Sequence, residues 1–572
     1  MPSDQKSVHK LNIKLKKVFG GKVHAELKDN VLYLTGELHE WDDVVQAGLM
    51  SANRKKYTVV NDIKFLGREI PPMKLPSVND KTLEGSVCDV LVIGGGITGC
   101  AITRELSRYK LVIMLAEKEH DVALHASGRN DGMIHPGADL KKGQLKKKYN
   151  DAGNSMYPAL CRELDVPFRY TGQYLCFTNS FMKAFAIVSL LYWKKMGVPA
   201  KYISRKKLLK NEPYLTKRVK CALSFPTSGI VCPYGLTIAY AENATDNGVK
   251  VCLDTAVTAM EVCNGEIKSV TTNRGTIYPK LVINAAGVFA EEIAKHANDR
   301  FFSIHPRRGT NLILDKKAAY QIKTIASLLE RSDSKSSRKE HSKGGGSIST
   351  VDGNLLIGPN AVETYEKEDF STRHENVKAV LAKQQKTAPG LSERDIITYF
   401  TGVRAATYEE DFIVSFGKFT KNIIHAAGIQ SPGVTAAPAI AVDISKMAAG
   451  FLNAQVNEKF NPVRKKIVRA AELSDDERDT LIKSEPDYGE IVCRCEEISR
   501  GEVLAALRRS VPCDTLDGVK RRVRPGMGRC QGSFCGPQIL KIIAEEKNIP
   551  LTEVKKMNKN STILQGSNKD NL

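Results

Sequence analysis

The chain has 572 residues, of which 42% are hydrophobic and 26% are charged, and its mean hydropathy is −0.27. These values are typical of a soluble globular protein of two to four domains, and no apolar run reaches the roughly 18–20 residues of a membrane-spanning helix. The net charge of +21 favours anionic partners, such as a phosphate- or carboxylate-bearing substrate or a membrane surface, although a lysine-rich surface is the plain alternative. We expect no nucleic-acid function, because no aromatic-interleaved basic stripe or helix-turn-helix pattern occurs.

The first residues lack the apolar h-region of a secretory signal, so we expect a cytoplasmic protein. Thirteen cysteines in such a chain argue against a disulfide framework. Nine of them are scattered singly through apolar segments, as Cys88, Cys176 and Cys252 are, and we expect them to be small buried hydrophobes. The other four are clustered near the C-terminal end.

Residues 1–70 predict a small α/β domain. The pattern predicts a strand over 31–38 with Gly36 in a turn, a helix over 40–55 and a strand over 57–67. This layout resembles the small lipid- or ligand-binding domain called BON, and such a module would dock a membrane or a partner. The Pro-rich segment 70–85 is typical of a linker.

Residues 86–450 alternate strand and helix patterns and form the bulk of the protein. Within them, the polar segment 331–346 predicts a flexible loop. Residues 453–488 are highly charged and indicate a connector with helical character. Residues 489–553 hold the cysteine cluster, and we expect the tail 558–572 to be disordered.

The segment 88–118 carries the sharpest motif. An apolar strand runs into Gly94-Gly95-Gly96-Ile97-Thr98-Gly99, and an amphipathic helix and a second strand ending at Glu117 follow. Gly94 permits a tight turn, Gly96 lets the backbone approach a pyrophosphate, and Gly99 lets the helix pack on the strand. Glu117 follows where a carboxylate accepts hydrogen bonds from ribose hydroxyl groups. The motif predicts a Rossmann-type dinucleotide site but does not separate NAD from FAD.

The segment Ser127-Gly128-Arg129-Asn130-Asp131-Gly132-Met133-Ile134-His135-Pro136-Gly137 resembles the flavin-contacting pattern of FAD-dependent oxidoreductases of the D-amino-acid-oxidase-like superfamily. The resemblance extends in order over 86–445 and is near the glycerol-3-phosphate dehydrogenase and L-2-hydroxyglutarate oxidase group. It implies FAD as a cofactor and an α/β fold in which a Rossmann-type FAD-binding domain is interleaved with an α+β substrate domain on a mixed sheet. The cofactor-binding residues that it implies, besides the glycines and Glu117, are Ser127, Arg129, Asn130, Val257, Gly287, Gly428, Ser431 and Gly433.

Cys493, Cys495, Cys530 and Cys535 form a C-x-C pair and a C-x4-C pair, a spacing that predicts a metal or cluster site. Tetrahedral zinc is the alternative, but zinc sites prefer two to four residues between paired cysteines. The Gly-rich second loop suits a [2Fe–2S] cluster better, because backbone N–H groups can donate to its sulfides. The region also resembles the bacterioferritin-associated-ferredoxin-like domain. Four ligands suffice, so we expect Cys513 to be a packed bystander.

Two residues are the leading catalytic candidates. An imidazole titrates near neutrality, and the resemblance puts His135 beside the flavin, so we expect it to take the proton of a hydroxyl group, or else only to hydrogen-bond the flavin or the backbone. Arg404, in a Gly-Val-Arg element, should bind the substrate's anion, or else pair with Glu409, Glu410 or Asp411. Candidates of second rank are His305, His425, Arg307 and Arg308. We expect the lysines of segment 139–150 to lie on a solvated helix face.

The residues and the resemblance together predict an FAD-dependent dehydrogenase of a small anionic secondary alcohol, with glycerol 3-phosphate as the leading candidate. Its electrons would leave through the cluster to an acceptor protein or a further subunit, with peripheral membrane association as an option. The turn Ala427-Gly428-Ile429-Gln430 departs from the G-G-K form common in the glycerol-phosphate family, which keeps L-2-hydroxyglutarate open. Amine oxidation and a non-catalytic role in electron transfer are the remaining alternatives.

Overall fold

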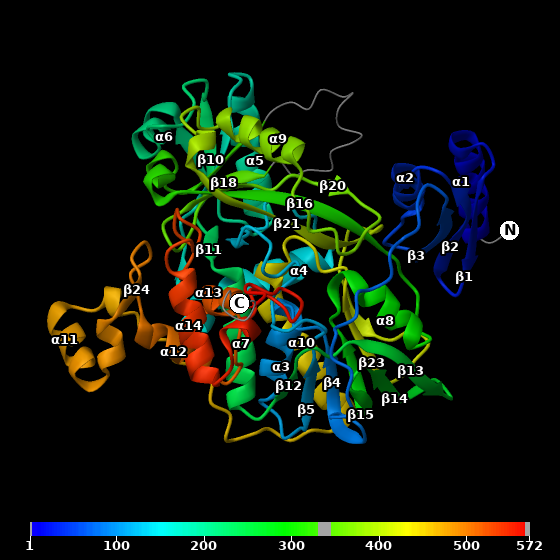
Figure 1. Ribbon diagram of the computed structural model, residues 1–572. Helices are drawn as coiled ribbons and strands as arrows, with labels where there is room; N and C mark the ends of the chain where they lie inside the picture. The colour runs from blue at the N-terminus through cyan, green and yellow to red at the C-terminus, as the bar shows by residue number, and fades with distance from the viewer. Residues whose placement is uncertain (1–2, 330–344, 567–572) are drawn as a thin grey trace.

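The computed structural model describes residues 3–329 and 345–566, which form an N-terminal domain, a central body built on two large sheets, and a C-terminal domain (Figure 1). The N-terminal domain is a three-stranded sheet in the order β1-β2-β3, with β1–β2 antiparallel and β2–β3 parallel. Asp29 and Asn30, both at positive φ, form the tight β1–β2 turn. The elements are α1 (Ser3–Phe19), β1 (Val23–Lys28), β2 (Val31–Leu38), α2 (Trp41–Ser51) and β3 (Thr58–Phe65).

The prediction of a turn at Gly36 is wrong, because Gly36 lies inside β2. Its φ is +141°, and a Cβ there would lie 2.0 Å from the carbonyl oxygen of Lys22. The close passage of the neighbouring backbone therefore requires the glycine. The segment between β3 and β4 contains no helix or strand.

The N-terminal domain packs on the central body through buried side chains. Tyr408 joins its apolar core, and the Tyr408 hydroxyl group accepts a hydrogen bond from Asn61 Nδ2 at 2.8 Å. Glu409 Oε1 accepts a hydrogen bond from the Val59 backbone N–H at 2.6 Å. Burial raises the pKa of Glu409 to about 7.

One sheet of the central body forms the nucleotide-binding core. Five strands run parallel in the order β12-β5-β4-β15-β23, and β13, β14 and β22 pair antiparallel at its margins. The strands are β4 (Ser86–Ile93), β5 (Ile113–Ala116), β12 (Lys250–Cys252), β13 (Val257–Cys263), β14 (Glu266–Thr272), β15 (Gly275–Asn284), β22 (Ile413–Phe416) and β23 (Ile423–Ala427).

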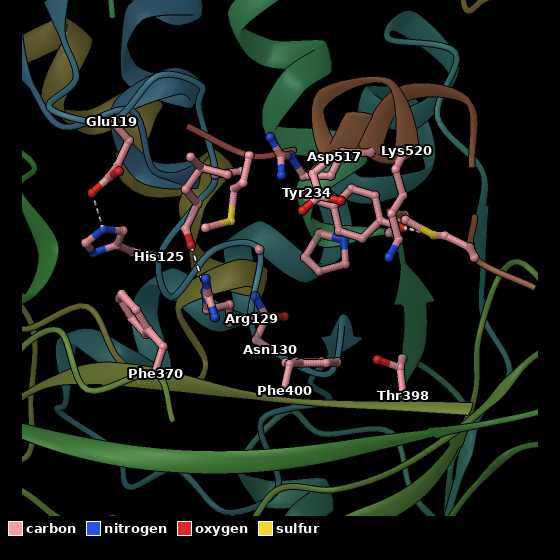
Figure 2. Close-up of a pocket in the computed structure, with 18 of the residues that line it drawn as sticks. Glu119, His125, Arg129, Asn130, Tyr234, Phe370, Thr398, Phe400, Asp517 and Lys520 are labelled. Carbon is pink, nitrogen blue, oxygen red and sulfur yellow. Dashed lines mark hydrogen bonds and ion pairs between the residues drawn. The ribbon is translucent and has the colours of Figure 1, made fainter. Parts of the chain in front are cut away.

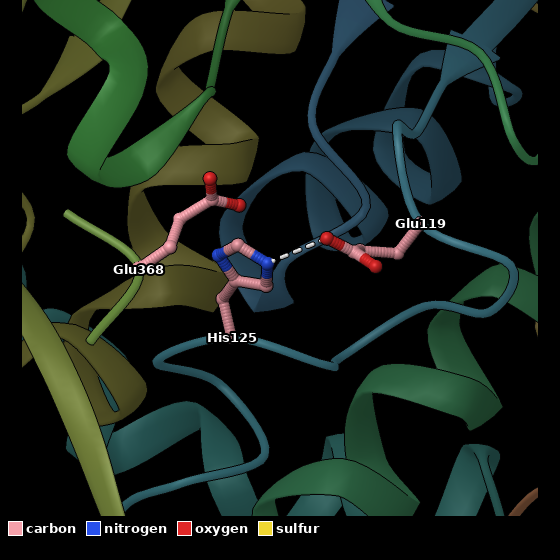
Figure 3. Close-up of side chains that lie close together, drawn as sticks. All are labelled: Glu119, His125 and Glu368. Atoms are coloured by element: carbon pink, nitrogen blue, oxygen red, sulfur yellow. Dashed lines mark hydrogen bonds and ion pairs between the residues drawn. The ribbon is translucent and has the colours of Figure 1, made fainter. Parts of the chain in front are cut away.

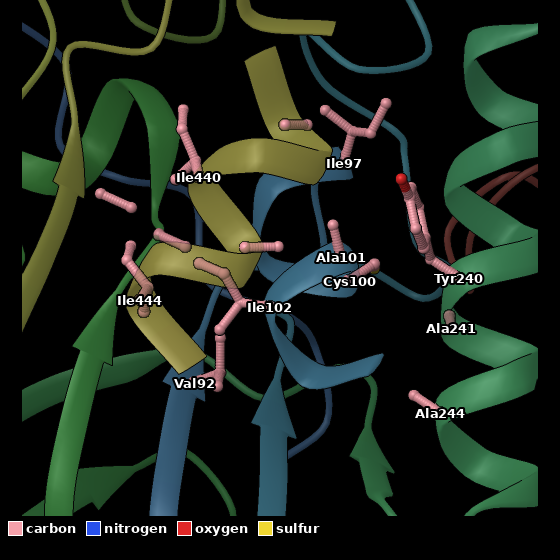
Figure 4. Packing of buried hydrophobic residues seen from close by; sticks show 14 of the residues in the cluster. Val92, Ile97, Cys100, Ala101, Ile102, Tyr240, Ala241, Ala244, Ile440 and Ile444 are labelled. Carbon is pink, nitrogen blue, oxygen red and sulfur yellow. The ribbon is translucent and has the colours of Figure 1, made fainter. Parts of the chain in front are cut away.

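A layer of helices covers this sheet, and α3 lies between α10 and α7 (Figure 4). Ile102 of α3, Ile440 of α10 and Tyr240 of α7 are buried in the same cluster. Of the described helices, only α10 is long and apolar enough to cross a membrane, and 61% of that window is buried inside the protein. The helices of this domain are α3 (Ile97–Leu106), α4 (Leu145–Glu163), α7 (Pro233–Asp246), α8 (Ala290–His296) and α10 (Gly433–Leu452).

The second sheet has nine strands. It is mixed, as predicted for the substrate domain. Its order is β20-β16-β19-β18-β17-β8-β10-β9, and β21 also pairs with β16. The antiparallel register of β16 and β21 sets Arg307 opposite Arg404. The strands are β8 (Gln173–Phe177), β9 (Lys201–Ser204), β10 (Cys221–Phe225), β16 (Ile304–Leu314), β17 (Ile325–Leu329), β18 (Gly346–Ser349), β19 (Leu355–Gly358), β20 (Val362–Glu363) and β21 (Ile396–Thr407). The helices beside them are α5 (Met182–Lys195), α6 (Arg205–Asn211) and α9 (His374–Gln385).

A small third sheet, β6-β11-β7, joins the two large ones. Its strands are β6 (Met133–Ile134), β7 (Phe168–Arg169) and β11 (Gly229–Val231). The C-terminal domain is mainly helical around a two-stranded sheet. Its elements are α11 (Asp475–Ser484), β24 (Ile491–Cys493), β25 (Ile498–Ser499), α12 (Arg500–Leu507), α13 (Leu516–Val523) and α14 (Gly536–Lys547).

The structure bears on the predicted loop, the predicted disordered tail and the nine scattered cysteines. Most of the predicted loop 331–346 lies outside the described residues. The tail is not wholly disordered, because Thr562 forms a β-bridge with Lys555 and residues 557–560 line a cavity described below. Of the nine scattered cysteines, seven are buried, but Cys232 is half-buried and Cys263 is exposed.

The raised pKa of Glu409 predicts a pH-dependent stability. The folded state binds the carboxyl proton more tightly than the unfolded chain does, so this stabilisation is complete below about pH 4.5 and is lost as the pH rises through about 7. We expect the free energy of unfolding to fall by at most about 1.4 kcal/mol per pH unit over that range, relative to Glu409→Gln. Urea denaturation across pH measures the difference. Glu69→Gln, at an exposed linker position, should behave like wild type; equal pH dependence in Glu409→Gln and wild type would contradict the assignment.

Candidate functional site

The turn between β4 and α3 brings three backbones into contact. Gly94 has φ +109°, and a Cβ there would lie 2.5 Å from the carbonyl oxygen of Ala285. A Cβ on Gly99 would lie 1.9 Å from the Gly94 carbonyl oxygen. Gly96 is the N-cap residue of α3, so the first backbone N–H groups of the helix have no partner within the helix and face the place where a pyrophosphate is expected.

Glu117 and Ser127 lie beside this turn. The Glu117 carboxylate accepts hydrogen bonds from the backbone N–H groups of Gly95, at 2.5 Å, and Glu119, at 2.8 Å. Burial raises the pKa of Glu117. Ser127 Oγ accepts a hydrogen bond from the Ile97 N–H at 2.8 Å, so it lies at the N-terminus of α3. A carboxylate at the end of β5 and a hydroxyl group at the helix N-terminus fit the ribose and the phosphates of a dinucleotide.

A cavity of about 1070 Å³ extends from this turn to the mixed sheet. Its size and its mixture of apolar walls and a few polar groups suit a bound cofactor together with a small substrate. The predicted site residues that line it are Gly96, Ser127, Arg129, Asn130, His135, Gly287, Arg404, Ser431 and Gly433.

Five of the predicted cofactor-binding residues do not line this cavity. Gly94, Gly99 and Glu117 belong to the β4–α3 turn or lie beside it, and the other two are Gly428 and Val257. Gly428 supports the turn after β23, where its φ is +65° and a Cβ would meet the Thr407 side chain at 2.6 Å. Val257 is 3% exposed in the apolar core at the start of β13. The assignment of Val257 to the cofactor site stays a prediction.

His135 faces the cavity with its backbone fixed on two sides. Its N–H donates to Thr435 Oγ1 at 2.9 Å, and its carbonyl oxygen accepts from Asn154 Nδ2 at 2.9 Å. His135 Nε2 lies 3.4 Å from Ser431 Oγ, in the turn that leads into α10. An imidazole held in this way is suited to proton transfer at the cavity wall.

Arg404 projects from β21 into the same cavity. Both of its terminal nitrogens donate to the carbonyl oxygen of Asn360 at 3.3 Å, and among the described residues no carboxylate oxygen lies within 4.0 Å of them. The expected alternative, pairing with Glu409, Glu410 or Asp411, is therefore wrong. Burial lowers the pKa of Arg404 to about 10, so the guanidinium stays charged at neutral pH although it forms no direct ion pair with a described residue.

Two cations that neighbour Arg404 in the cavity, Arg307 and Lys146, are paired with carboxylates. Arg307 pairs with Glu363 at 2.7 Å and with Glu410 at 2.8 Å. Lys146 Nζ lies 3.6 Å from Glu410 and lines the cavity. The expectation of a solvated helix face is thus wrong for Lys146, whose side chain is 5% exposed. Gln430, which was not singled out as a site residue, donates to Glu410 at 2.7 Å.

The two histidines that were catalytic candidates of second rank, His305 and His425, have structural partners. His425 is fully buried, and its Nε2 lies 2.7 Å from Asp299 Oδ2. His305 is also buried, pairs with Glu363 at 2.9 Å and stacks on Tyr408. Neither lines the cavity.

A second cavity, of about 890 Å³, lies between the nucleotide-binding domain and the C-terminal domain (Figure 2). Arg129, Asn130, Asp131 and Ile348 line both cavities, so the segment 129–131 and strand β18 lie between them. Met527 and Gln531, from the loop that holds the last two clustered cysteines, form the far wall together with Lys520.

A group of Glu119, His125 and Glu368 lies at the edge of the second cavity (Figure 3). His125 Nε2 lies 2.9 Å from Glu119 Oε1. Lys118 Nζ lies 2.6 Å from each of the two carboxylates. A protein ammonium group therefore already supplies the cation that these carboxylates need, and the group is a charge-compensated network.

The four clustered cysteines form two pairs. Cys495 Sγ and Cys530 Sγ lie 3.8 Å apart, and Cys493 hydrogen-bonds Cys535. No three of the four sulfurs lie within 4.8 Å of one another, whereas a tetrahedral zinc site, with Zn–S of about 2.3 Å, would bring all four within about 3.8 Å. Two separated pairs fit two irons with two thiolates each.

Backbone amide groups point at these thiols. Cys493 accepts from the N–H groups of Gly526, Glu496 and Cys495, and Cys535 is its side-chain partner; together they lower the pKa of Cys493 to about 6. Such donors stabilise thiolate and sulfide charge in a cluster. Cys513 is 5% exposed, and its thiol donates to the Ala506 carbonyl oxygen at 3.6 Å, in the domain core.

The chain matches two protein-family models: FAD dependent oxidoreductase over residues 89–447, and BFD-like [2Fe-2S] binding domain over residues 491–545. A glycerol 3-phosphate dehydrogenase of Caloramator mitchellensis is 40% identical over 491 residues, covering 85% of this chain and 99% of the relative. One subunit of the anaerobic glycerol-3-phosphate dehydrogenase of Escherichia coli is 25% identical, covering 80% and 88%. The FAD-bound L-alpha-glycerophosphate oxidase of Mycoplasma pneumoniae matches with a TM-score of 0.61 and 26% identity, covering 66% and 98%. FAD and a [2Fe–2S] cluster are thus the cofactors of this chain.

Gly99→Ala should abolish most FAD binding. The added Cβ, 1.9 Å from the Gly94 carbonyl oxygen, must push α3 away from the turn that faces the pyrophosphate. Flavin absorbance per protein after reconstitution measures the loss. Gly450→Ala, where no atom lies within 4 Å, is the matched control and should retain FAD. Normal flavin content in Gly99→Ala would refute this role.

Cys535→Ser should remove the cluster, whereas Cys513→Ser should keep it, because only the former thiol belongs to the two pairs. Iron and acid-labile sulfide analysis after anaerobic purification measures both. Stoichiometric zinc and no sulfide in the wild-type protein would contradict the pairwise assignment.

Proposed function

Because this chain belongs to the family of FAD-dependent oxidoreductases, we propose that it is a dehydrogenase that oxidises glycerol 3-phosphate. The observation that carries the proposal is Arg404, a buried guanidinium in the flavin cavity without a carboxylate partner among the described residues. The glycerol-phosphate enzymes among the relatives, one of them 40% identical over nearly its whole length, support this substrate.

The electrostatics of the cavity favour a bound anion. Arg307 and Lys146 are already paired with Glu363 and Glu410, so their charges are largely cancelled. Arg404 retains its charge, and burial makes that charge costly until an anion binds. A phosphate oxygen pair matches the planar fork of a guanidinium, so the substrate's anionic end belongs at Arg404.

His135 is the proposed base for the other end of the substrate. With its backbone held by Thr435 and Asn154, the imidazole reaches the cavity beside Ser431. A neutral imidazole accepts the proton of the secondary hydroxyl group while the Arg404 contact fixes the orientation of the carbon chain. When bound, FAD supplies the hydride acceptor and the [2Fe–2S] cluster supplies one-electron chemistry.

The proposed electron acceptor is a one-electron carrier protein or a further subunit. The cluster loop has an inner side, where Met527 and Gln531 line the second cavity next to Arg129. Phe534 of the same loop is 83% exposed, and Cys495, which is also exposed, lies with its Sγ 3.8 Å from Cys530 Sγ. An exposed thiolate edge beside an exposed aromatic ring suits contact with a protein partner.

We place the protein in the cytoplasm, with peripheral contact to the inner face of the membrane. None of the thirteen cysteines, all within the described residues, forms a disulfide, as expected in a reducing compartment. The lysines of α5 and α6 form the basic surface that supports the membrane contact.

Arg404→Gln should lower substrate-driven flavin reduction about 100-fold, because it removes an uncompensated cation of the cavity and the loss of a buried charge pair costs about 3 kcal/mol. Arg404→Lys should recover only part of the rate, since a lysine lacks the planar fork. Anaerobic bleaching of the flavin by glycerol 3-phosphate measures both. Arg373→Gln, at an exposed site on the rim of the same domain, is the control and should react normally.

The same assay separates the alternatives. Bleaching by L-2-hydroxyglutarate and not by glycerol 3-phosphate would replace the proposed substrate, consistent with the Gln430 departure from the glycerol-phosphate pattern. Bleaching by neither compound would refute the proposal in favour of an amine substrate or a non-catalytic role.

A further inference from the structure

Helix α5 is largely apolar on both of its faces, yet it lies on the surface. Its inner face, with Ala186 and Trp193, packs on the core of the substrate domain. Its outer face carries Phe181, at 88% exposed, and Leu191, at 70% exposed. Ile187, Phe185, Val188 and Tyr192 are also more than half exposed. A helix of this kind is normally covered on both faces, so its outer face calls for an apolar partner.

The exposed side chains form one continuous band. Phe181, Phe185, Val188 and Tyr192 recur at intervals of four, three and four residues, which places them on one side of the helix, and Leu191 and Ile187 extend that side. Aromatic and branched aliphatic residues in one band are the composition of helices that lie in the headgroup region of a bilayer.

The segment of the chain that contains this band carries charge of one sign. Residues 166–211 contain nine lysines and arginines and no aspartate or glutamate. Lys183, Lys194 and Lys195 are exposed on α5 itself, and Lys206, Lys207 and Lys210 belong to α6. Helices α5 and α6 both contact β9 and β10 at the edge of the mixed sheet, and Figure 1 shows them at the end of the molecule away from the nucleotide-binding sheet. The apolar band therefore has a basic rim.

We propose that α5 is an interfacial helix by which this enzyme docks on an anionic lipid bilayer. The band enters the boundary between headgroups and acyl chains, and the lysines of α5 and α6 contact the lipid phosphates. A second copy of the chain is a poor occupant, because two such faces would oppose positive charge with positive charge. The inference specifies the peripheral location proposed above and does not depend on the identity of the substrate.

The docking site adjoins the catalytic cavity. Phe185, Val188 and Tyr192 line the flavin cavity as well as facing the surface. Binding at the bilayer therefore places the mouth of the substrate cavity at the membrane surface, while the cluster loop lies on a different domain.

The test uses full-length holoenzyme and flotation with vesicles of phosphatidylcholine containing phosphatidylglycerol, or of phosphatidylcholine alone. We expect flotation with the anionic vesicles, weaker binding to the neutral ones, and a decrease in binding as salt is added. Phe181→Ser/Leu191→Ser and Lys194→Glu/Lys195→Glu should each weaken binding at least about tenfold. None of these four residues lines the flavin cavity.

The matched controls change the same chemistry elsewhere. Lys16→Glu/Lys17→Glu alters two exposed lysines of α1, and Val87→Ser/Val112→Ser removes two exposed apolar side chains at the nucleotide-binding sheet. Both should float like wild type. Flavin content and anaerobic substrate bleaching, measured without vesicles, should be unchanged in the α5 variants; if bleaching is absent in the wild type as well, the substrate proposal fails and the docking result still stands.

A measurement on the unaltered protein guards against misfolded variants. Hydrogen–deuterium exchange of wild type should show new protection of residues 181–195 when anionic vesicles are added. Three results would overturn the proposal: wild type that does not float with anionic vesicles, α5 variants that float as wild type does, or an α5-dependent dimer in sedimentation without lipid.

Discussion

The alignment of the two cofactor sites depends on one buried anion, Asp121. Its carboxylate, 2% exposed, receives hydrogen bonds from Arg521 at 2.9 Å and from both terminal nitrogens of Arg522, at 2.9 and 3.1 Å. Although burial opposes ionisation, the two guanidinium groups hold the pKa of Asp121 at about 2. Asp121 belongs to the segment that leads to Ser127, and the arginines belong to α13, just before the cluster loop. This charge network therefore couples the position of the flavin segment to that of the cluster ligands.

A second buried carboxylate repeats the arrangement at another contact of the C-terminal domain. Glu242 on α7 pairs with Arg464 and Arg509, each at 2.6 Å. Removing one partner from such a network leaves an uncompensated buried charge, which costs several kcal/mol, so the geometry is strongly fixed. The same rule explains the flavin cavity, where Arg307 and Lys146 form ion pairs with carboxylates and no carboxylate oxygen of the described residues lies within 4.0 Å of Arg404. Arg404 is therefore a buried charge of the cavity that is available to a ligand.

How much the sequence predicts depends on how local the chemistry is. The glycines of the first turn and the four clustered cysteines act within short segments, so their spacing indicated the nucleotide turn and the cluster site. The pairing of the thiols was not indicated, because each pair joins one cysteine of the C-x-C motif to one of the C-x4-C motif. His135 and Arg404 were found through a family resemblance, and the structure brings them into one cavity. Lys146, Gln430 and the second cavity were missed, because each depends on elements that meet only in the tertiary structure. Gly36 was misread for the same reason: the backbone that excludes a side chain there belongs to residue 22.

The order of elements along the chain has a consequence for assembly. Every residue that lines the flavin cavity lies at or before Val434, whereas all four cluster cysteines follow residue 492. During synthesis, the nucleotide-binding and substrate domains are therefore complete while the cluster ligands are still inside the ribosome, and domains fold in the order in which they emerge. The wall formed by Lys520, Met527 and residues 557–560 closes last. Until it closes, the flavin segment is open to solvent on the side that later faces the cluster, which leaves a newly made chain a route for loading the larger cofactor first.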